Sequence, residues 1–238
     1  MNNVSIATIC WVRSNHEEEV LKSSLSQLAK LNLPVYITDG GSSESFVRYL
    51  RTFSNFTVLQ ARGLWPQVMN SVNGASSDGA KFIFYTEPDK LDFFSSHVAK
   101  MLQYPVNENT GIVLASRSSN GFSTFPSFQQ ITETAINQCC KEVIEEDVDY
   151  CYGPFLFSAQ LIPFLNALDT NIGWGWRPFL FAIAHRSGFK IESLEGDFNC
   201  PADQRNDDKL ERIYRMKQLT QNIQGLTLAA TMDLPKTI

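Results

Sequence analysis

Apolar and polar positions alternate in regular blocks along the first 90 residues. Short runs rich in apolar and β-branched residues predict four strands, at 3–12, 33–39, 56–61 and 81–86. Between these runs, apolar residues recur at helical spacing. They predict three helices, at 16–30, 44–53 and 65–76. Strands and helices that alternate in this way predict a mostly parallel α/β sheet with helices on both faces.

The second half of the chain has a less regular pattern. It predicts strands at 110–118 and 189–198, and a strand or turn that leads into a helix within 153–168. The expected helices lie at 97–105, 127–146, 180–188 and 207–226. Because no repeat or linker separates the halves, we expect a single domain over residues 1–238 in which the second half extends the same sheet.

Composition narrows the classes of protein that fit this pattern. The 238 residues, with a mass of 26.8 kDa, are enough for one sizeable core. A net charge of −5 without a basic stripe argues against nucleic acid as a partner. No apolar run approaches the length of a transmembrane helix, and the N-terminus does not resemble a signal peptide. The five cysteines form no CxxC pair, which favours free thiols in the cytoplasm.

Acidic residues follow two of the predicted strands. Asp39 ends one strand, and Glu87-Pro88-Asp89 follows another. In parallel α/β sheets, ligands bind beyond the carboxyl ends of the strands, so both acids point to one crevice. Paired carboxylates there suit a hard cation such as Mg²⁺. The alternative is a simple turn with exposed acids.

Three motifs in order carry a resemblance to a known family. Asp39-Gly40-Gly41-Ser42 comes first, Arg62-Gly63 with Asn70 follows, and Glu87-Pro88-Asp89 ends the series. This order resembles the family 2 glycosyltransferases, which have the GT-A fold. The resemblance implies a UDP- or GDP-sugar donor, a divalent Mg²⁺ or Mn²⁺, and hexosyltransferase-like activity. It also implies that residues 1–120 form the nucleotide-sugar-binding half, and that 121–238 form the acceptor-side half with a C-terminal helix.

The chain departs from the family pattern at two places. Glu87 stands where the acid-x-acid motif usually begins with aspartate. After the Gly-Trp-Gly stretch, where inverting members generally have a catalytic base, this chain has Trp176-Arg177-Pro178. Another carboxylate then activates the acceptor, or transfer retains the anomeric configuration, or catalysis is lost. Retaining enzymes that make glucosyl- or mannosylglycerates also lack an obvious base, and the chain resembles them in this respect.

On the donor side, the resemblance assigns nucleotide-sugar-binding roles to five residues. Asp39 would accept a hydrogen bond from the base, and Gly40 would allow the backbone to approach closely. Arg62 would pair with a phosphate, Asn70 belongs to the same motif, and Glu87 would lie near the ribose. Both residues also have non-binding explanations. Asp39 would then belong to the turn before a helix capped by Ser42 or Ser43, and Arg62 would be a solvated surface arginine.

Metal and acceptor roles complete the predicted site. Asp89 would hold the metal, and Asp203, or alternatively Asp197, would replace a histidine that family members often supply, unless these acids simply belong to a polar loop. Arg117 and Arg177 are the expected catalytic residues, binding a phosphate or an anionic acceptor. The alternative for Arg117 is a sheet-edge arginine with a local acidic partner. Trp174 and Trp176 would form a wall that stacks on a sugar, although core packing explains at least one of them equally well.

The sequence therefore predicts a cytoplasmic, metal-dependent glycosyltransferase that acts on a small-molecule or glycan acceptor. Two alternatives stay open at this point. One is a catalytically silent nucleotide-sugar-binding protein, which the missing base favours. The other is a nucleotidyltransferase, which would usually have a glycine-rich basic loop after its first strand, whereas residues 10–19 contain no glycine. The sugar, the acceptor and the oligomeric state are not encoded in any motif.

Overall fold

A computed structural model describes residues 3–234 of the chain. The chain divides into two compact units. The first unit comprises Met1–Asn107 and Pro154–Asn166, and the second comprises Glu108–Gly153 and Ala167–Ile238. The segment Pro154–Asn166, from the second half of the sequence, therefore belongs to the first unit. The expectation of a single domain over the whole chain stays a prediction.

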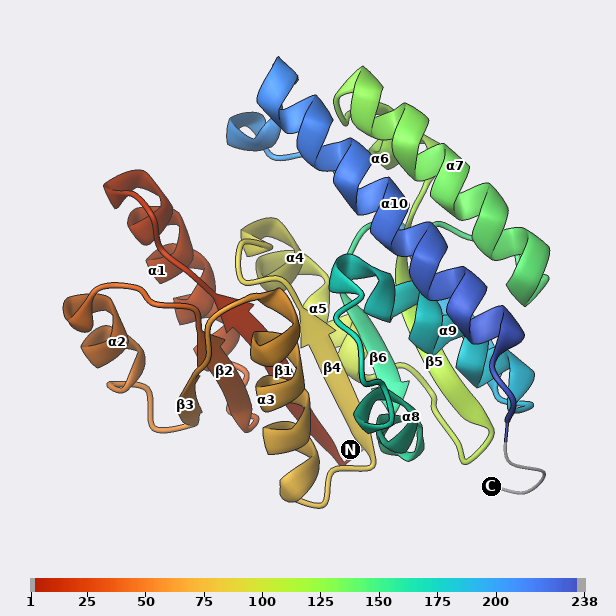
Figure 1. The fold of residues 1–238 in the computed structure, drawn as a ribbon. Helices are drawn as coiled ribbons and strands as arrows, with labels where there is room; N and C mark the ends of the chain where they lie inside the picture. Colours follow the sequence, from red (N-terminus) through yellow and green to blue (C-terminus); the bar gives the residue numbers. More distant parts are fainter. Residues whose placement is uncertain (1–2, 235–238) are drawn as a thin grey trace. The chain divides into compact units, whose positions relative to one another are not determined.

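The first unit contains strands in the order β3-β2-β1-β4-β6 (Figure 1). β1 pairs in parallel with β2 and with β4, and β2 pairs in parallel with β3. β6 pairs with β4 in the antiparallel direction. The bounds are β1 Val4–Cys10, β2 Val35–Asp39, β3 Phe56–Gln60, β4 Phe82–Thr86 and β6 Phe155–Ser158. The predicted α/β class with mostly parallel strand pairing is confirmed.

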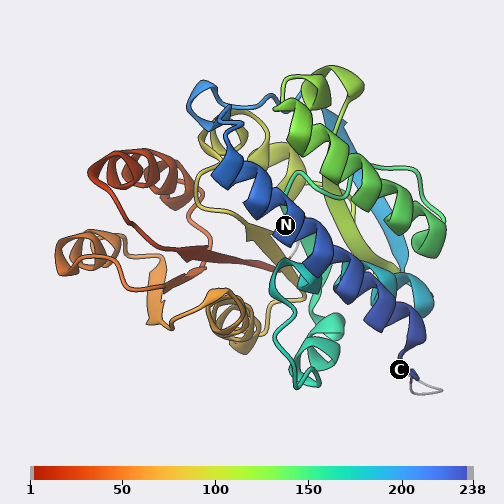
Figure 2. The same ribbon diagram turned by 45° about the horizontal axis from the view of Figure 1, so that its top comes forward.

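Helices cover both faces of this sheet. The longest are α1 (Asn15–Ala29) and α3 (Leu64–Ser77), and Figure 2 shows them on opposite sides of the strands. α1 packs against α4, whereas α3 packs against β1 and β2. Every residue of β1, β2 and β4 is buried, as expected for parallel strands covered on both faces. The shorter helices are α2 Glu44–Leu50, α4 Leu91–Ser96, α5 Val98–Leu102, the 3₁₀ turn η1 Ala159–Leu161 and α8 Ile162–Asn166.

The second unit is built on the parallel pair β5 (Thr110–Arg117) and β7 (Lys190–Gly196). Two long helices, α7 (Ser127–Ile144) and α10 (Lys209–Thr231), lie side by side in both ribbon views (Figures 1 and 2). α10 also packs against α9. The remaining elements are α6 Ser119–Ser123, η2 Gly173–Gly175, α9 Trp176–Arg186 and η3 Ala202–Gln204.

The predicted helix at 180–188 begins earlier than expected, at Trp176. The indole of Trp176 is fully buried, as are Phe179 and Phe181. Nine consecutive residues of α9 are buried, so this helix is buried on all sides and shows no helical periodicity at its start. The pattern of apolar positions alone therefore could not mark where it begins. The short helix α4 was not predicted either.

All five cysteines are free thiols, and they differ in accessibility. Cys10, Cys140 and Cys200 are buried, Cys151 is half-buried, and Cys139 is exposed. Burial raises the pKa of Cys10 and of Cys151 well above the ordinary thiol value, and it raises the pKa of Cys140 to about 12. Within residues 3–234, no helix is both long and apolar enough to cross a membrane.

Candidate functional site

The register of the first unit places two predicted binding residues at one edge of the sheet. Cys10 of β1 lies beside Asp39, and Thr8 of β1 lies beside Thr86. Asp39 and Glu87 therefore both lie at the carboxyl ends of their strands, with β1 between them. Two strand spacings separate these ends by about 10 Å. This edge is where open α/β sheets bind ligands.

Asp39 is held firmly at the end of β2. Its side chain is buried, with 1% exposure, and its carboxylate accepts hydrogen bonds from the backbone N–H groups of Gly41 and Ser42. The Cys10 thiol lies 3.7 Å from Oδ1. Ser43 caps helix α2 by accepting from the N–H of Phe46. The predicted helix cap is therefore present, and a base-binding role of Asp39 stays a prediction.

Gly40 has a packing role that the motif did not reveal. A Cβ atom at this position would lie 2.8 Å from Nε2 of Gln67. This amide donates hydrogen bonds to the carbonyl oxygens of Cys10 and Thr38, and so joins α3 to the ends of β1 and β2. A side chain at Gly40 would displace Gln67 from this position. The predicted close approach of a ligand to Gly40 stays a prediction.

Arg62 and Asn70 follow the carboxyl end of β3, which pairs with β2 so that Gln60 lies beside Asp39. Arg62 is exposed and precedes Gly63, whose φ of 93° is readily adopted only by glycine. Asn70 lies on an exposed side of α3, where its amide is 3.5 Å from the Gln60 carbonyl oxygen. Arg62 is therefore at the same sheet edge as Asp39.

The acid pair Glu87 and Asp89 follows β4 directly. Both residues are half-buried, and a turn over Pro88 and Asp89 leads into α4. Two carboxylates so close in sequence offer the oxygen ligands that hard cations prefer. Over residues 3–234, no group of three or more His, Cys, Asp and Glu side chains gathers in a metal-binding arrangement. A cation at this turn would therefore take its other ligands from phosphate or water, which is usual for Mg²⁺.

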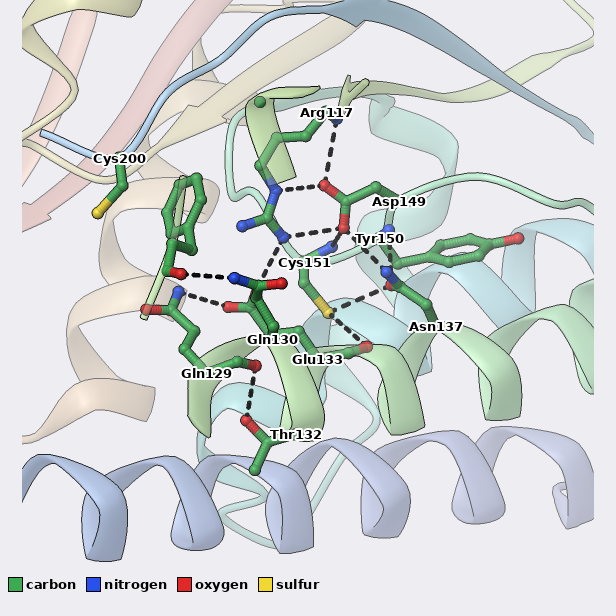
Figure 3. Close-up of polar contacts among 12 residues, drawn as sticks. Arg117, Gln129, Gln130, Thr132, Glu133, Asn137, Asp149, Tyr150, Cys151 and Cys200 are labelled. Carbon is green, nitrogen blue, oxygen red and sulfur yellow. Dashed lines mark hydrogen bonds and ion pairs between the residues drawn. The ribbon is translucent and has the colours of Figure 1, made fainter. Parts of the chain in front are cut away.

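In the second unit, Arg117 ends β5 inside a buried ion-pair cluster (Figure 3). Its Nε lies 2.6 Å from Oδ2 of Asp149, and its Nη2 lies 3.0 Å from Oδ1 of the same carboxylate. Nη2 also donates to Glu133 at 2.7 Å. The rings of Phe122 and Phe125 lie within 5 Å of the guanidinium carbon. The Arg117 side chain is only 1% exposed.

These contacts favour the structural alternative for Arg117. Asp149 also accepts hydrogen bonds from the side chain of Asn137 and the backbone of Cys151, so the cluster fixes the loop after α7 (Figure 3). Burial acts to raise the pKa of Asp149, but Arg117 and the hydrogen bonds lower this pKa below its ordinary value. Both carboxylates that hold Arg117 lie far from it in sequence, and no local motif marks them.

Arg177 and the two tryptophans lie around the start of α9. Arg177 is buried and donates to the Cys151 carbonyl oxygen at 3.1 Å. Its guanidinium carbon lies 5.7 Å from the centre of the half-buried Trp174 ring. Trp176, in contrast, has no exposed surface, which favours core packing over a sugar-stacking role. Asp203 is exposed on η3, so its predicted metal role rests on sequence alone.

Comparison with solved structures gives matches along nearly the whole chain. Glucosyl-3-phosphoglycerate synthase from Mycobacterium tuberculosis, in complex with Mn²⁺, UDP-glucose and phosphoglyceric acid, matches with a TM-score of 0.66 and 13% identity. The match covers 98% of this chain and 81% of that one. A mycobacterial protein matches with a TM-score of 0.64, 11% identity, and coverage of 98% and 76%. No protein-family model and no curated protein matches the chain.

The chain has the GT-A fold. At 11–13% identity these matches establish the architecture and leave the roles of individual residues open. The GT-A architecture confirms the fold implied by the resemblance that the three motifs carry.

One candidate residue at the same edge of the GT-A sheet was missed by the motif analysis. Trp11 follows β1 directly and is 53% exposed. The neighbouring Val12 N–H donates to the Ser42 hydroxyl, which joins this segment to the turn after Asp39. An exposed tryptophan after a buried strand was the available signal, but the predicted strand ran to residue 12 and included it.

Proposed function

We propose that the protein is a metal-dependent glycosyltransferase that uses a nucleoside-diphosphate sugar. The observation that carries this proposal is the position of Asp39 and the Glu87–Asp89 pair at one edge of a parallel sheet, on two strands with β1 between them. The similarity to structures of an enzyme crystallised with Mn²⁺ and UDP-glucose supports it. Trp11, which is 53% exposed at that edge and has the Arg13 guanidinium carbon 5.5 Å from its ring centre, would stack on the nucleotide base.

Glu87 and Asp89 would hold the divalent cation. Mg²⁺ or Mn²⁺, when bound there, would stabilise the negative charge that builds on the departing diphosphate. Arg62 would add a second positive charge for the phosphates. Asp39, which already receives backbone hydrogen bonds, would orient the base through its carboxylate.

On the acceptor side, Arg177 and Trp174 are the proposed binding residues. Arginine stays protonated at neutral pH, so Arg177 would bind a carboxylate or phosphate on the acceptor. The first turn of α9 contains no acid, so no base for inversion lies where inverting enzymes generally have one. We therefore propose retention. The acceptor hydroxyl would lose its proton to the departing diphosphate oxygen as the sugar–oxygen bond to the diphosphate breaks and the new bond forms on the same face.

A thermal-shift screen of UDP- and GDP-sugars, with and without Mn²⁺, tests the donor proposal. A ligand at ~100 times its dissociation constant should add about 2.7 kcal/mol of stability. For a chain of this size, that gain corresponds to a rise in Tm of roughly 5–10 °C. If no nucleotide sugar raises Tm with or without Mn²⁺, the donor proposal is wrong.

Proton NMR of the first product formed from an α-linked donor tests retention. An α-linked product is expected. A β-linked product would exclude retention and direct the search for a base to the other carboxylates of the second unit. The absence of an acid from the first turn of α9 also favours a second candidate, a silent nucleotide-sugar-binding protein. That candidate predicts tight donor binding without transfer to any acceptor.

A further inference from the structure

The segment Gly173–Gly175, which carries Trp174, lies directly against helix α10. Gly173 has a φ of 55°, and a Cβ atom there would overlap the side chain of Gln221. A Cβ atom on Gly175 would overlap the carbonyl oxygen of Gln221, and one on Gly225 would overlap the carbonyl oxygen of Gly175. Glycine is therefore required on both sides of this contact, because the two backbones meet without side chains between them.

Two hydrogen bonds from Trp174 to α10 accompany this contact. The backbone N–H of Trp174 donates to Oε1 of Gln221 at 3.2 Å. The indole Nε1–H donates to the Tyr214 hydroxyl at 2.9 Å. One bond fixes the backbone of Trp174 and the other fixes the direction of its ring. The Arg177 guanidinium lies over the same ring, so the orientation of Trp174 also affects the surroundings of Arg177.

The three α10 residues involved share one face of the helix. Tyr214 and Gln221 are seven residues apart, and Gly225 follows four residues later. Residues at these spacings lie above one another on an α-helix. A single face of α10 therefore supplies the close backbone contact and both hydrogen-bond acceptors for Trp174.

We propose that Tyr214 and Gln221 are positioning residues that set the orientation of Trp174 for acceptor binding. This inference rests on the proposed function, in which Trp174 contacts the acceptor. The competing explanation is ordinary helix packing. The glycine contacts already bring the two backbones together, and the Tyr214 side chain is 41% exposed. Removing only its hydroxyl therefore separates positioning from packing.

The test compares Tyr214→Phe with Thr220→Val. Both variants lose one hydroxyl from α10, but the Thr220 hydroxyl is exposed and bonds only within its own helix, to the Met216 carbonyl oxygen. The chain has four tryptophans. Their indole N–H signals can be followed in a ¹H–¹⁵N correlation spectrum, and Trp174→Phe assigns the Trp174 signal. In Tyr214→Phe this signal should shift and its proton should exchange faster with water, while the other indole signals and Tm stay unchanged.

The second readout is steady-state transfer of glucose from UDP-glucose, with Mn²⁺ and 3-phosphoglycerate as the acceptor probe. Losing one hydrogen bond to Trp174 should raise the acceptor KM roughly three- to tenfold and leave the donor KM unchanged. Thr220→Val should match the wild type in both readouts. Gln221→Leu, which cannot accept from the Trp174 backbone, should shift the acceptor KM in the same direction.

The outcomes separate the two proposals. An unchanged Trp174 signal in Tyr214→Phe overturns the positioning role, whatever the activity. A shifted signal with an unchanged acceptor KM shows that the orientation of Trp174 has no consequence for the acceptor, and also overturns it. If the wild type transfers no glucose and 3-phosphoglycerate does not perturb the Trp174 signal, the acceptor role of Trp174 fails, and the donor-binding screen decides the proposed function.

Discussion

Two carboxylates illustrate how a proposed binding residue differs from a structural one. Asp89 is half-buried in a turn after β4, where we propose that it binds the metal. Asp149 is buried against Arg117 and receives hydrogen bonds from Asn137 and Cys151. Removing the charge of Asp89 should affect ligand binding, whereas removing the charge of Asp149 should affect folding.

We predict that Asp89→Asn abolishes the Mn²⁺-dependent rise in Tm on nucleotide-sugar binding and leaves Tm without ligand nearly unchanged. The amide keeps the shape of the side chain but loses the negative charge that a divalent cation requires. Asp92→Asn, an exposed residue in the first turn of α4, is the matched control and should respond like the wild type. Unchanged Mn²⁺ dependence in Asp89→Asn would exclude the proposed metal site.

Asp149→Asn should be destabilising at neutral pH, on the order of 3–5 kcal/mol, because it removes one partner of a buried ion pair. The folded-state pKa of Asp149 is below its ordinary value, so its contribution is complete above about pH 4 and is lost as pH falls through the folded pKa. The difference between wild type and variant should therefore narrow below about pH 4. Urea unfolding between pH 7 and pH 3 measures this.

Asp147→Asn is the control for that experiment. Asp147 lies in the same loop and pairs with Lys141, but both side chains are exposed. Exposed pairs contribute about 0–1 kcal/mol, so this variant should remain close to the wild type at every pH. A constant gap between wild type and Asp149→Asn across the pH range would contradict the ionic origin of the effect.

At the scale of secondary-structure elements, sequence patterns were a reliable guide where apolar residues were periodic. Helices α1, α2, α3 and α7 begin within one residue of their predicted starts. Strands β2 and β4 end at the predicted acids or directly before them. The start of α9 and the short α4 were missed, because one is buried all round and the other is less than two turns long.

The candidate site could be predicted only where its residues lie in local motifs. Asp39 and the Glu87–Asp89 pair follow strands that are recognisable from sequence, and the parallel register brings them to one edge. The partners of Arg117 are 16 and 32 residues away in sequence, so a local pattern could not reveal its ion pairs. The same holds for Trp174, whose indole bonds to a residue 40 positions later.

The contact of α10 with Gly175 leads to a prediction about Gly225. Alanine usually favours a helix over glycine by about 1 kcal/mol. Here its Cβ would overlap the Gly175 carbonyl oxygen, and overpacking typically costs 1–3 kcal/mol. Gly225→Ala should therefore lower Tm. Thr227→Ala, an exposed position on α10, should change stability by less than about 0.5 kcal/mol. A higher Tm for Gly225→Ala would contradict this prediction, because it would show that α10 shifts to accommodate the Cβ atom without loss of stability.

At the scale of the whole molecule, the five cysteine thiols differ in burial, so an alkylating reagent should react with only some of them in the native protein. Thiolate is the reactive form, and burial raises the pKa of Cys10, Cys140 and Cys151. A short maleimide reaction at pH 7 should therefore attach one group per chain, at exposed Cys139 on α7, and five after unfolding, as intact-mass spectrometry can count. Cys139→Ser should abolish the native adduct. A single dye can thus be installed without mutagenesis, giving a fluorescent reporter on the helix that lies beside α10.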